Sequence, residues 1–277
     1  MQVPTHLSEP QGGFQCTLVL PTYNAVGFIE STVDRLNAFL ERHGNWCAIF
    51  VCDGCTDGTS EKLAELVSGL GPRIRVVSCD VNRGKGSVLR DGLNLCDTQY
   101  LVYTDVDFAY DPEEAIQIVE ALKAGADIAV ANRASAQSEF LISPRHFSSI
   151  YRRHILSRCF NWWLRRVLPI SICDTQAGLK GMTFRAWKML VPRMTSDGFF
   201  FDVELLARGA AAGLRIEEMP VCFKHVNHST VRMMSHGWQM VRETVKLRHN
   251  LHAASRSPVT VTVSREVHDA VRAVSPP

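Results

Sequence analysis

The chain has 277 residues, of which 46% are hydrophobic, and its formal net charge is +2. A chain of this size can bury one large core or two modest ones, and we expect one. The charge gives no reason to expect a nucleic-acid partner, and no stretch approaches the ~18 consecutive apolar residues of a membrane span.

The two ends of the chain differ in composition from its middle. Residues 1–13 are polar and lack the apolar core of a secretion signal, and residues 251–277 form an appendage with a candidate edge strand near 258–264. We therefore expect one domain over residues 14–250, in a cytoplasmic protein. Among nine cysteines, Cys52 and Cys55 form a lone Cys-x-x-C pair, so we expect reduced thiols rather than a zinc site.

Five short apolar runs in the first half of the chain are predicted to be buried strands. Each is followed by a polar or glycine-rich loop, and the segments between them repeat apolar residues at the spacing of helices. The runs are residues 16–20, 47–52 and 74–78, the run from Tyr100 to Asp105, and residues 127–131.

This alternation predicts an α/β fold with a mainly parallel sheet flanked by helices. The carboxyl ends of the strands then share one edge, where open α/β sheets bind ligands. Asp53, Lys85, Asp105 and Arg133 each belong to one of the loops that follow these strands. We expect them to line a single site.

Asp105 and Asp107 end the fourth run, one residue apart. Carboxylates at a strand end offer hard oxygen ligands to Mg²⁺ or Mn²⁺ and leave positions for water and a diphosphate. The alternative is a turn in which an Asp side chain bonds to its own backbone.

Two glycine-containing loops have features of ligand-binding turns. In residues 53–59, Asp53 leaves its strand where a base or ribose could donate to it, and Asp57 is expected to cap the next helix. Residues 82–86, Asn-Arg-Gly-Lys-Gly, place Lys85 at the start of a helix, which suits an anionic ligand. The spacing is not that of a Walker A loop, and a solvated surface charge is the alternative for Lys85.

In this order, Pro21-Thr-Tyr-Asn24, residues 53–59, residues 82–86 and Thr104-Asp-Val-Asp107 resemble the inverting glycosyltransferases of family 2, which have the GT-A fold. Residues 174–180 and 199–206 resemble later motifs of the branch that glycosylates polyprenyl phosphates, and the dolichyl-phosphate glucosyltransferase group is the most similar. The resemblance spans residues 16–248.

The resemblance implies roles for individual residues. Those expected to bind the nucleotide sugar are Pro21, Tyr23, Asn24, Asp53, Lys85 and Asp105. Asp105 and Asp107 would hold the metal, with Asp107 and Arg133 acting in catalysis at the diphosphate. Three residues depart from the family pattern and leave base identity and metal coordination open: Ala25, Cys52 and Ala109.

The acceptor side depends on the second half of the chain. Asp174 is the first candidate for a general base if the acceptor is a hydroxyl, with Asp202 and Glu204 behind it, whereas a phosphate acceptor is already ionised and needs none. Asp202 and Glu204 share a face on a strand and diverge on a helix, and both remain open. Residues expected to bind the acceptor are Arg152, Lys180 and Arg232.

Two amphipathic stretches accompany these residues. Residues 145–166 mix aromatic side chains with arginines, which suits a membrane interface, although such a stripe can equally pack on the sheet. Residues 231–248 predict a final helix with Trp238, Val241 and Val245 on one face.

We therefore expect transfer of a hexose from UDP-glucose or GDP-mannose to a polyprenyl phosphate, by a protein that associates peripherally with the cytosolic membrane face. The first alternative keeps this donor chemistry and uses a soluble sugar or a natural-product hydroxyl as acceptor. The second is a noncatalytic nucleotide-sugar binding protein.

Overall fold

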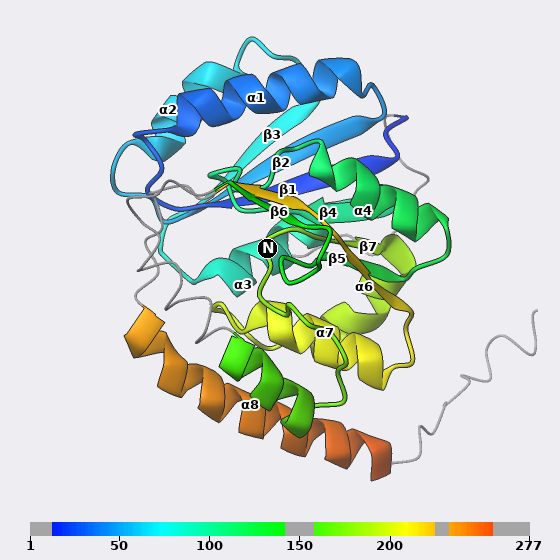
Figure 1. Cartoon of the computed structure of the whole chain (residues 1–277). Helices are drawn as coiled ribbons and strands as arrows, with labels where there is room; N and C mark the ends of the chain where they lie inside the picture. The colour runs from blue at the N-terminus through cyan, green and yellow to red at the C-terminus, as the bar shows by residue number, and fades with distance from the viewer. Residues whose placement is uncertain (1–12, 142–157, 225–232, 257–277) are drawn as a thin grey trace, which may run out of the picture.

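The computed structural model describes residues 13–141, 158–224 and 233–256. Strands and helices alternate through most of this range (Figure 1). The elements are β1 (Cys16–Thr22), α1 (Ile29–Arg42), β2 (Trp46–Asp53), α2 (Thr59–Val67), β3 (Ile74–Cys79), α3 (Lys85–Asn94), β4 (Tyr100–Tyr103), α4 (Glu114–Lys123), β5 (Ile128–Ala131), β6 (Glu139–Leu141), β7 (Lys180–Thr183), α6 (Phe184–Leu190), η2 (Val191–Arg193), α7 (Phe201–Ala211), β8 (Ile216–Met219), β9 (Cys222–Lys224) and α8 (Met233–Arg256).

Seven strands form one sheet in the order β3-β2-β1-β4-β7-β5-β8. β7 is antiparallel to both of its neighbours, β4 and β5, and the other pairs are parallel. The five strands predicted from the sequence are all present, so the expectation of a mainly parallel α/β sheet is confirmed. A short parallel pair, β6 and β9, lies apart from the main sheet.

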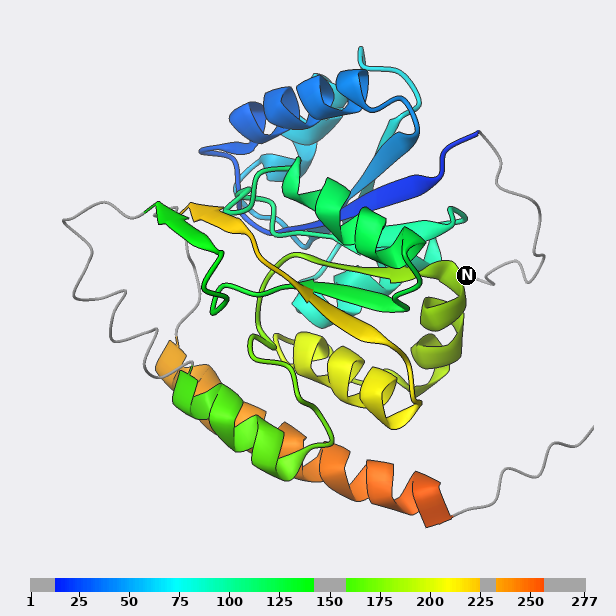
Figure 2. The same ribbon diagram turned by 45° about the vertical axis from the view of Figure 1, so that its right-hand side comes forward.

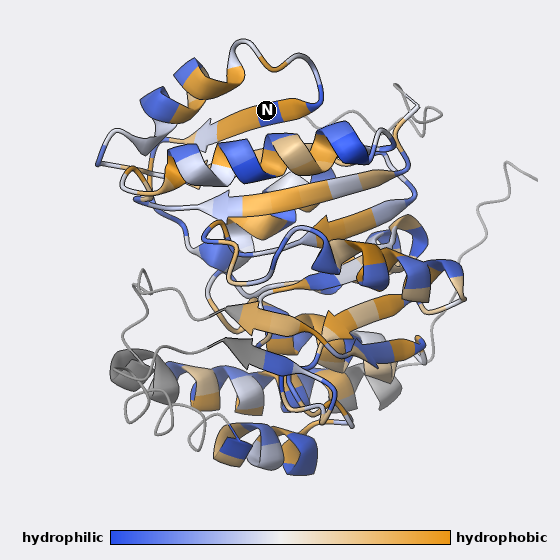
Figure 3. Cartoon of the chain, turned by 45° about the horizontal axis from the view of Figure 1, so that its top comes forward, coloured by the Kyte–Doolittle hydropathy of each residue, from blue (hydrophilic) through white to orange (hydrophobic). Residues whose placement is uncertain are grey.

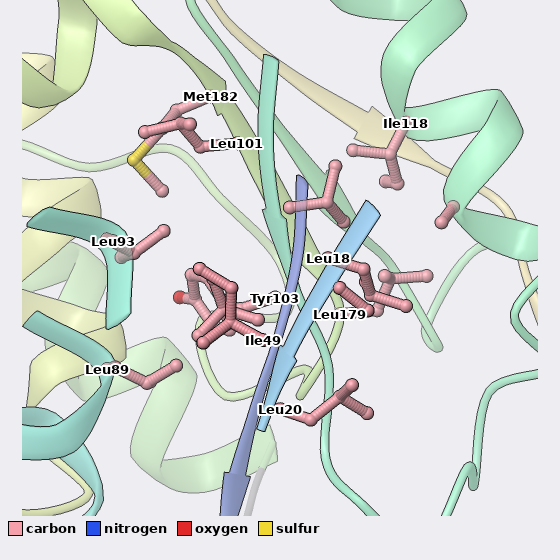
Figure 4. Close-up of a cluster of buried hydrophobic side chains, with 14 of the residues drawn as sticks. Leu18, Leu20, Ile49, Leu89, Leu93, Leu101, Tyr103, Ile118, Leu179 and Met182 are labelled. Carbon is pink, nitrogen blue, oxygen red and sulfur yellow. The ribbon is translucent and has the colours of Figure 1, made fainter. Parts of the chain in front are cut away.

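Helices cover both faces of the sheet because the central strands are apolar on both sides (Figure 3). α3 contacts β1 and β2 with Leu89 and Leu93, whereas α4 places Ile118 against β7 on the opposite face (Figure 4). α3 approaches closely at Gly92, where an added Cβ would lie 2.6 Å from Val19 Cγ1. The core is therefore continuous through the sheet.

An outer layer of two helices packs on α7. A helical segment over residues 158–167 and α8 lie side by side in Figures 1 and 2. They bury one cluster against α7, formed by Leu164, Leu168, Ile170, Phe200, Val203, Ala207 and Leu247. The apolar stripe predicted within residues 145–166 is thus packed on the protein where it is described, which is the second of the two readings given above.

The final helix differs from its prediction. α8 begins at Met233 and runs to Arg256, past the expected domain boundary at residue 250. Its buried positions include Thr244 and Leu247, whereas Val245 is 57% exposed, so Val245 does not belong to the packed face. Within the described residues, no helix combines the length and hydropathy needed to cross a membrane. All nine cysteines are unpaired thiols.

Candidate active site

The loops after β1 and β2 hold each other at the carboxyl edge of the sheet. The Asn24 side chain accepts a hydrogen bond from the Thr56 backbone N–H at 2.9 Å, and Asn24 has a φ of 47°. Asp57 accepts from the Thr59 N–H at 3.0 Å, as expected of a cap. Asn24, expected to bind the nucleotide, therefore also fixes the neighbouring loop, and Tyr23 beside it is 43% exposed.

Asp53 connects β2 to the glycine-rich loop that precedes α3. Its Oδ1 accepts from the Arg83 backbone N–H at 2.7 Å and its Oδ2 from the Gly84 N–H at 2.9 Å. The two loops touch at Gly54, where an added Cβ would lie 2.3 Å from the Asn82 nitrogen. Asp53 is 4% exposed, and its partners in this structure are the backbone of residues 83–84 rather than solvent.

Lys85 and Asp105 form an ion pair at the centre of this edge. The Lys85 Nζ lies 2.6 Å from Asp105 Oδ1 and 3.8 Å from Asp202 Oδ2. Burial disfavours the charged ammonium, but Asp105 and Asp202 outweigh it and raise the pKa of Lys85. The Asp105 side chain is 41% exposed, so a ligand can reach it.

Asp107 follows Asp105 through a tight turn. Its Oδ1 accepts from the Ala109 N–H at 3.1 Å, and the Phe108 N–H donates to the Asp105 carbonyl at 3.1 Å. Phe108 has a φ of 46°, a left-handed conformation that is uncommon for a bulky residue. The turn predicted as the alternative to a metal site is therefore present, and it leaves Asp105 accessible beside Asp107.

Behind Lys85, α7 provides a buried carboxylate. Asp202 Oδ1 accepts from the Tyr103 hydroxyl at 2.7 Å and from Lys180 Nζ at 2.8 Å. Since residues 201–211 are a helix, Glu204 diverges from Asp202 and instead accepts from the backbone of Thr195 and Ser196. Neither carboxylate is placed to act as a general base.

Lys180 was expected to bind the acceptor, but its side chain is fully buried between Asp202 and the Ala177 carbonyl. Burial lowers the pKa of this lysine, with Asp202 acting in the opposite direction. A lysine next to the buried Met182 in a central strand is the signal that predicts such an internal partner. The geometry favours a structural role for Lys180.

Arg133 and Asp174 form a bidentate ion pair. Arg133 Nε lies 2.7 Å from Asp174 Oδ2, and its Nη2 lies 2.9 Å from Oδ1. Burial alone would raise the pKa of Asp174, but the guanidinium outweighs burial and holds the pKa below its ordinary value. A carboxylate held in this way is a poor general base, and it fixes the guanidinium in one orientation.

Two residues at the same edge were not anticipated. At Gly178 an added Cβ would lie 2.0 Å from Asp105 Oδ2, so the carboxylate occupies the space of the missing side chain. Tyr110 is 1% exposed, and its hydroxyl has no hydrogen-bond partner among the described residues. A glycine and a tyrosine in loops carry little sequence signal, because their roles depend on which loops meet in space. Arg152 and Arg232 lie outside the described residues.

Two carboxylates with exposed access fit a divalent cation that shares its shell with a diphosphate. Asp105 and Asp107 supply hard oxygens, and the cradle at Gly178 keeps space for the Asp105 carboxylate. Across residues 13–141, 158–224 and 233–256, no three metal-ligating side chains converge on one point. The remaining ligands would therefore come from the nucleotide and from water.

Comparison with known families decides the assignment. The family model described as "Glycosyl transferase family 2" matches residues 17–186, which include Asp53, Lys85, Asp105, Arg133 and Asp174. The chain belongs to glycosyl transferase family 2. It is a glycosyltransferase, and the alternative of a noncatalytic binding protein is not pursued.

Several curated relatives of this family 2 chain act on lipid-linked substrates by name. It is 30% identical over 76% of its length to the glycosyltransferase AglD of Haloferax volcanii, but the match spans only 33% of AglD. It is 24% identical to the dolichyl-phosphate beta-glucosyltransferase of Saccharomyces cerevisiae, covering 84% of this chain and 73% of the relative. The polyprenol monophosphomannose synthase of Mycolicibacterium smegmatis is 27% identical, over 74% of this chain and 76% of that protein.

Solved structures confirm the GT-A fold. Glucosyl-3-phosphoglycerate synthase from Mycobacterium tuberculosis, in complex with Mn²⁺, UDP and phosphoglyceric acid, superimposes with a TM-score of 0.62 at 20% identity. The match covers 88% of this chain and 81% of the synthase. The same synthase was also solved with Mg²⁺ and UDP. Members of the fold thus bind a divalent cation together with a nucleotide.

Proposed function

We propose that this family 2 enzyme transfers glucose from UDP-glucose to a polyprenyl phosphate. The observation that carries the proposal is the Arg133–Asp174 pair. It presents a fixed cation at the sheet edge and leaves Asp174 too strongly paired to take a proton. An acceptor that is already an anion suits such a site, because a phosphate needs an orienting cation and no base.

The donor assignment is supported by the relatives. Curated dolichyl-phosphate beta-glucosyltransferases from three organisms match the chain, with 73% to 76% of each protein covered. UDP is the nucleotide in the superimposed synthase complexes. GDP-mannose is the competing donor, since a mannose synthase also matches.

The proposed reaction forms one bond and breaks one bond at the anomeric carbon. An acceptor phosphate oxygen attacks that carbon from the face opposite the leaving group, and the bond to the diphosphate oxygen breaks with its electron pair going to UDP. Asp105 and Asp107 would hold Mg²⁺ or Mn²⁺, which when bound neutralises charge on the diphosphate. Lys85 and Arg133 supply fixed positive charge along this edge.

The residues expected at the nucleotide are distributed over the loops that meet here. Pro21 and Tyr23 end β1 and begin its loop, next to Asp53 at the end of β2. Asp53 fixes the backbone of residues 83–84, which in turn positions Lys85. We assign Pro21, Tyr23 and Asp53 to the nucleoside side and Lys85 to the diphosphate side.

A donor screen tests the proposal. The full chain is incubated with Mn²⁺, radiolabelled UDP-glucose or GDP-mannose and a short-chain polyprenyl phosphate in detergent, and the label is then extracted into organic solvent. We expect extraction of glucose label that a chelator and Asp107→Asn both abolish. Transfer of label to a soluble sugar or hydroxyl acceptor alone would contradict the acceptor assignment, and label from GDP-mannose alone would contradict the donor.

A further inference from the structure

The two helices of the outer layer differ sharply between their inner and outer faces. Their inner faces are apolar and bury Leu164, Leu168 and Leu247 against α7. This packing uses up the apolar stripe that an inserted amphipathic helix would need. What remains available to a partner is the outer face of helix 158–167 and of α8, seen along the lower side of Figure 2.

That outer face is strongly basic. Residues 158–168 and 239–251 together contain one carboxylate, Glu243. The exposed cations in these two stretches are Arg158, Arg165, Arg166, Arg242, Lys246 and Arg248. The whole chain has 30 basic and 28 acidic side chains, so this concentration of positive charge is local.

Large apolar side chains lie exposed among these cations. Trp162 is 55% exposed, and the Arg166 guanidinium lies 5.1 Å from its ring centroid. Val245 on α8 is 57% exposed. An indole beside arginines is amphipathic and suits the boundary between lipid headgroups and acyl chains, whereas a purely polyanionic partner has no use for exposed apolar surface.

The same layer contacts the loop that carries Asp174 and Gly178. Asn161 Oδ1 accepts from the Thr175 hydroxyl at 2.6 Å, and Arg165 Nη1 lies 3.7 Å from Cys173 Sγ. From α8, Met240 Sδ lies 3.6 Å from Gln176 Nε2. Both helices are therefore attached to the acceptor side of the site.

We propose that the outer face of helix 158–167 and α8 is the surface through which the enzyme docks on an anionic lipid bilayer. Charge complementarity holds the protein at the headgroups, and Trp162 enters the interface. The attachment through Asn161, Arg165 and Met240 sets the orientation of the Asp174 loop relative to the bilayer. The inference rests on the proposed function to the extent that a polyprenyl phosphate resides in such a bilayer.

Vesicle sedimentation tests the docking surface with the full chain. Vesicles of equimolar phosphatidylcholine and phosphatidylglycerol are compared with pure phosphatidylcholine, at low and high salt. The triple variant Arg166→Gln, Arg242→Gln, Lys246→Gln removes three outer cations that make no contact with the site loop among the described residues. The matched control Arg185→Gln, Lys188→Gln, Arg193→Gln removes the same charge from α6 and η2, where these side chains are also exposed.

We expect the unmodified chain to sediment with the anionic vesicles alone and to be released by salt, because the attraction is screened. The outer-layer variant should partition roughly a hundredfold more weakly, at about fivefold for each cation removed near an anionic surface, while the control variant partitions like the unmodified chain. Equal losses in both variants, or equal binding to the two vesicle types, would overturn the proposal. Retention on heparin through the same three side chains without vesicle binding would identify a polyanionic macromolecule instead.

Activity in detergent separates this proposal from the proposed function. The outer-layer variant should transfer glucose to detergent-dispersed polyprenyl phosphate at the unmodified rate while it fails to bind vesicles. An enzyme that binds anionic vesicles but transfers nothing to polyprenyl phosphate would sink the acceptor assignment and leave the docking surface standing. The converse result would remove the docking surface alone.

Discussion

Gly178 controls the position of Asp105 through the side chain that it lacks. An added Cβ would lie 2.0 Å from Asp105 Oδ2 and 2.8 Å from its Cγ, whereas the φ of Gly178 lies outside the left-handed region. Alanine is therefore compatible with the backbone but not with the carboxylate in its present place. The requirement for glycine here is one of space rather than of backbone conformation.

The variant Gly178→Ala is expected to fold and to bind Mn²⁺ poorly in the presence of UDP. Displacing one of two metal-binding carboxylates should weaken the metal about 10–100-fold, similar to the loss of a group that orients a ligand. Titration calorimetry with Mn²⁺ and UDP measures this directly. Gly198→Ala is the matched control, because nothing lies within 4 Å of its added Cβ. Unchanged Mn²⁺ affinity in Gly178→Ala would refute the role of this space.

Asp174 is expected to act through Arg133 rather than on a proton. Asp174→Asn should lower kcat by about a hundredfold, because a misplaced orienting group costs on that order. If Asp174 only holds the guanidinium, the double variant with Arg133→Gln loses no more activity than Arg133→Gln alone. Losses that multiply in the double variant would show that Asp174 has an independent role, such as that of a base.

At the scale of elements, α7 contributes as much to the site as the loops do, because Asp202 joins it to β4, β7 and α3. This carboxylate accepts from Tyr103 and Lys180 and lies 3.8 Å from Lys85 Nζ. Burial would raise the pKa of Asp202, but the two lysines outweigh it and lower the pKa. The chain of charges Asp105, Lys85, Asp202 and Lys180 therefore runs from the exposed edge into the core.

The variant Lys180→Met distinguishes a structural lysine from one that binds the acceptor. Leaving Asp202 buried with fewer partners should cost about 3–5 kcal/mol in the free energy of unfolding. The KM for polyprenyl phosphate should stay unchanged where the variant is folded. Urea denaturation and steady-state kinetics on the same preparation provide the two values. A raised KM with unchanged stability would support the acceptor role first expected for this residue.

The parallel elements were predictable from the sequence, and the elements that depend on long-range pairing were not. Strand runs such as residues 16–20 and 47–52 are apolar on both faces, a pattern that survives without tertiary information. β7 has the sequence Lys-Gly-Met-Thr, which carries no strand period and is set by pairing with β4 and β5. The loop residues Asp53 and Asp105 could be predicted because they follow recognisable strands, whereas Gly178 and Tyr110 could not.

For the whole molecule, buried carboxylates link stability to pH. Asp174, Asp202 and Glu204 all have a lowered pKa in the folded protein; for Glu204, burial is outweighed by hydrogen bonds from Thr195 and Ser196. The unfolded chain takes up these protons first as pH falls, near the ordinary values of 3.8 and 4.5. Their contribution is therefore present above these values and is lost as pH falls below them.

We expect the free energy of unfolding to decrease below about pH 4.5, by on the order of 1–3 kcal/mol for each of these carboxylates. Urea denaturation at a series of pH values measures the slope. Asp174→Asn removes one titrating group and should make the slope shallower, although the variant is less stable at neutral pH. An acid limb that is identical in the two proteins would exclude Asp174 from the linkage.

The antiparallel direction of β7 has a consequence for how this molecule can diversify. A parallel strand delivers the loop that follows it to the ligand edge, whereas β7 delivers the loop that precedes it, residues 173–179. Donor loops and acceptor loop therefore enter the site from opposite chain directions and belong to separate stretches of sequence. An exchange of residues 173–179 between relatives would reprogram what receives the sugar without rewriting the part of the chain that recognises the nucleotide.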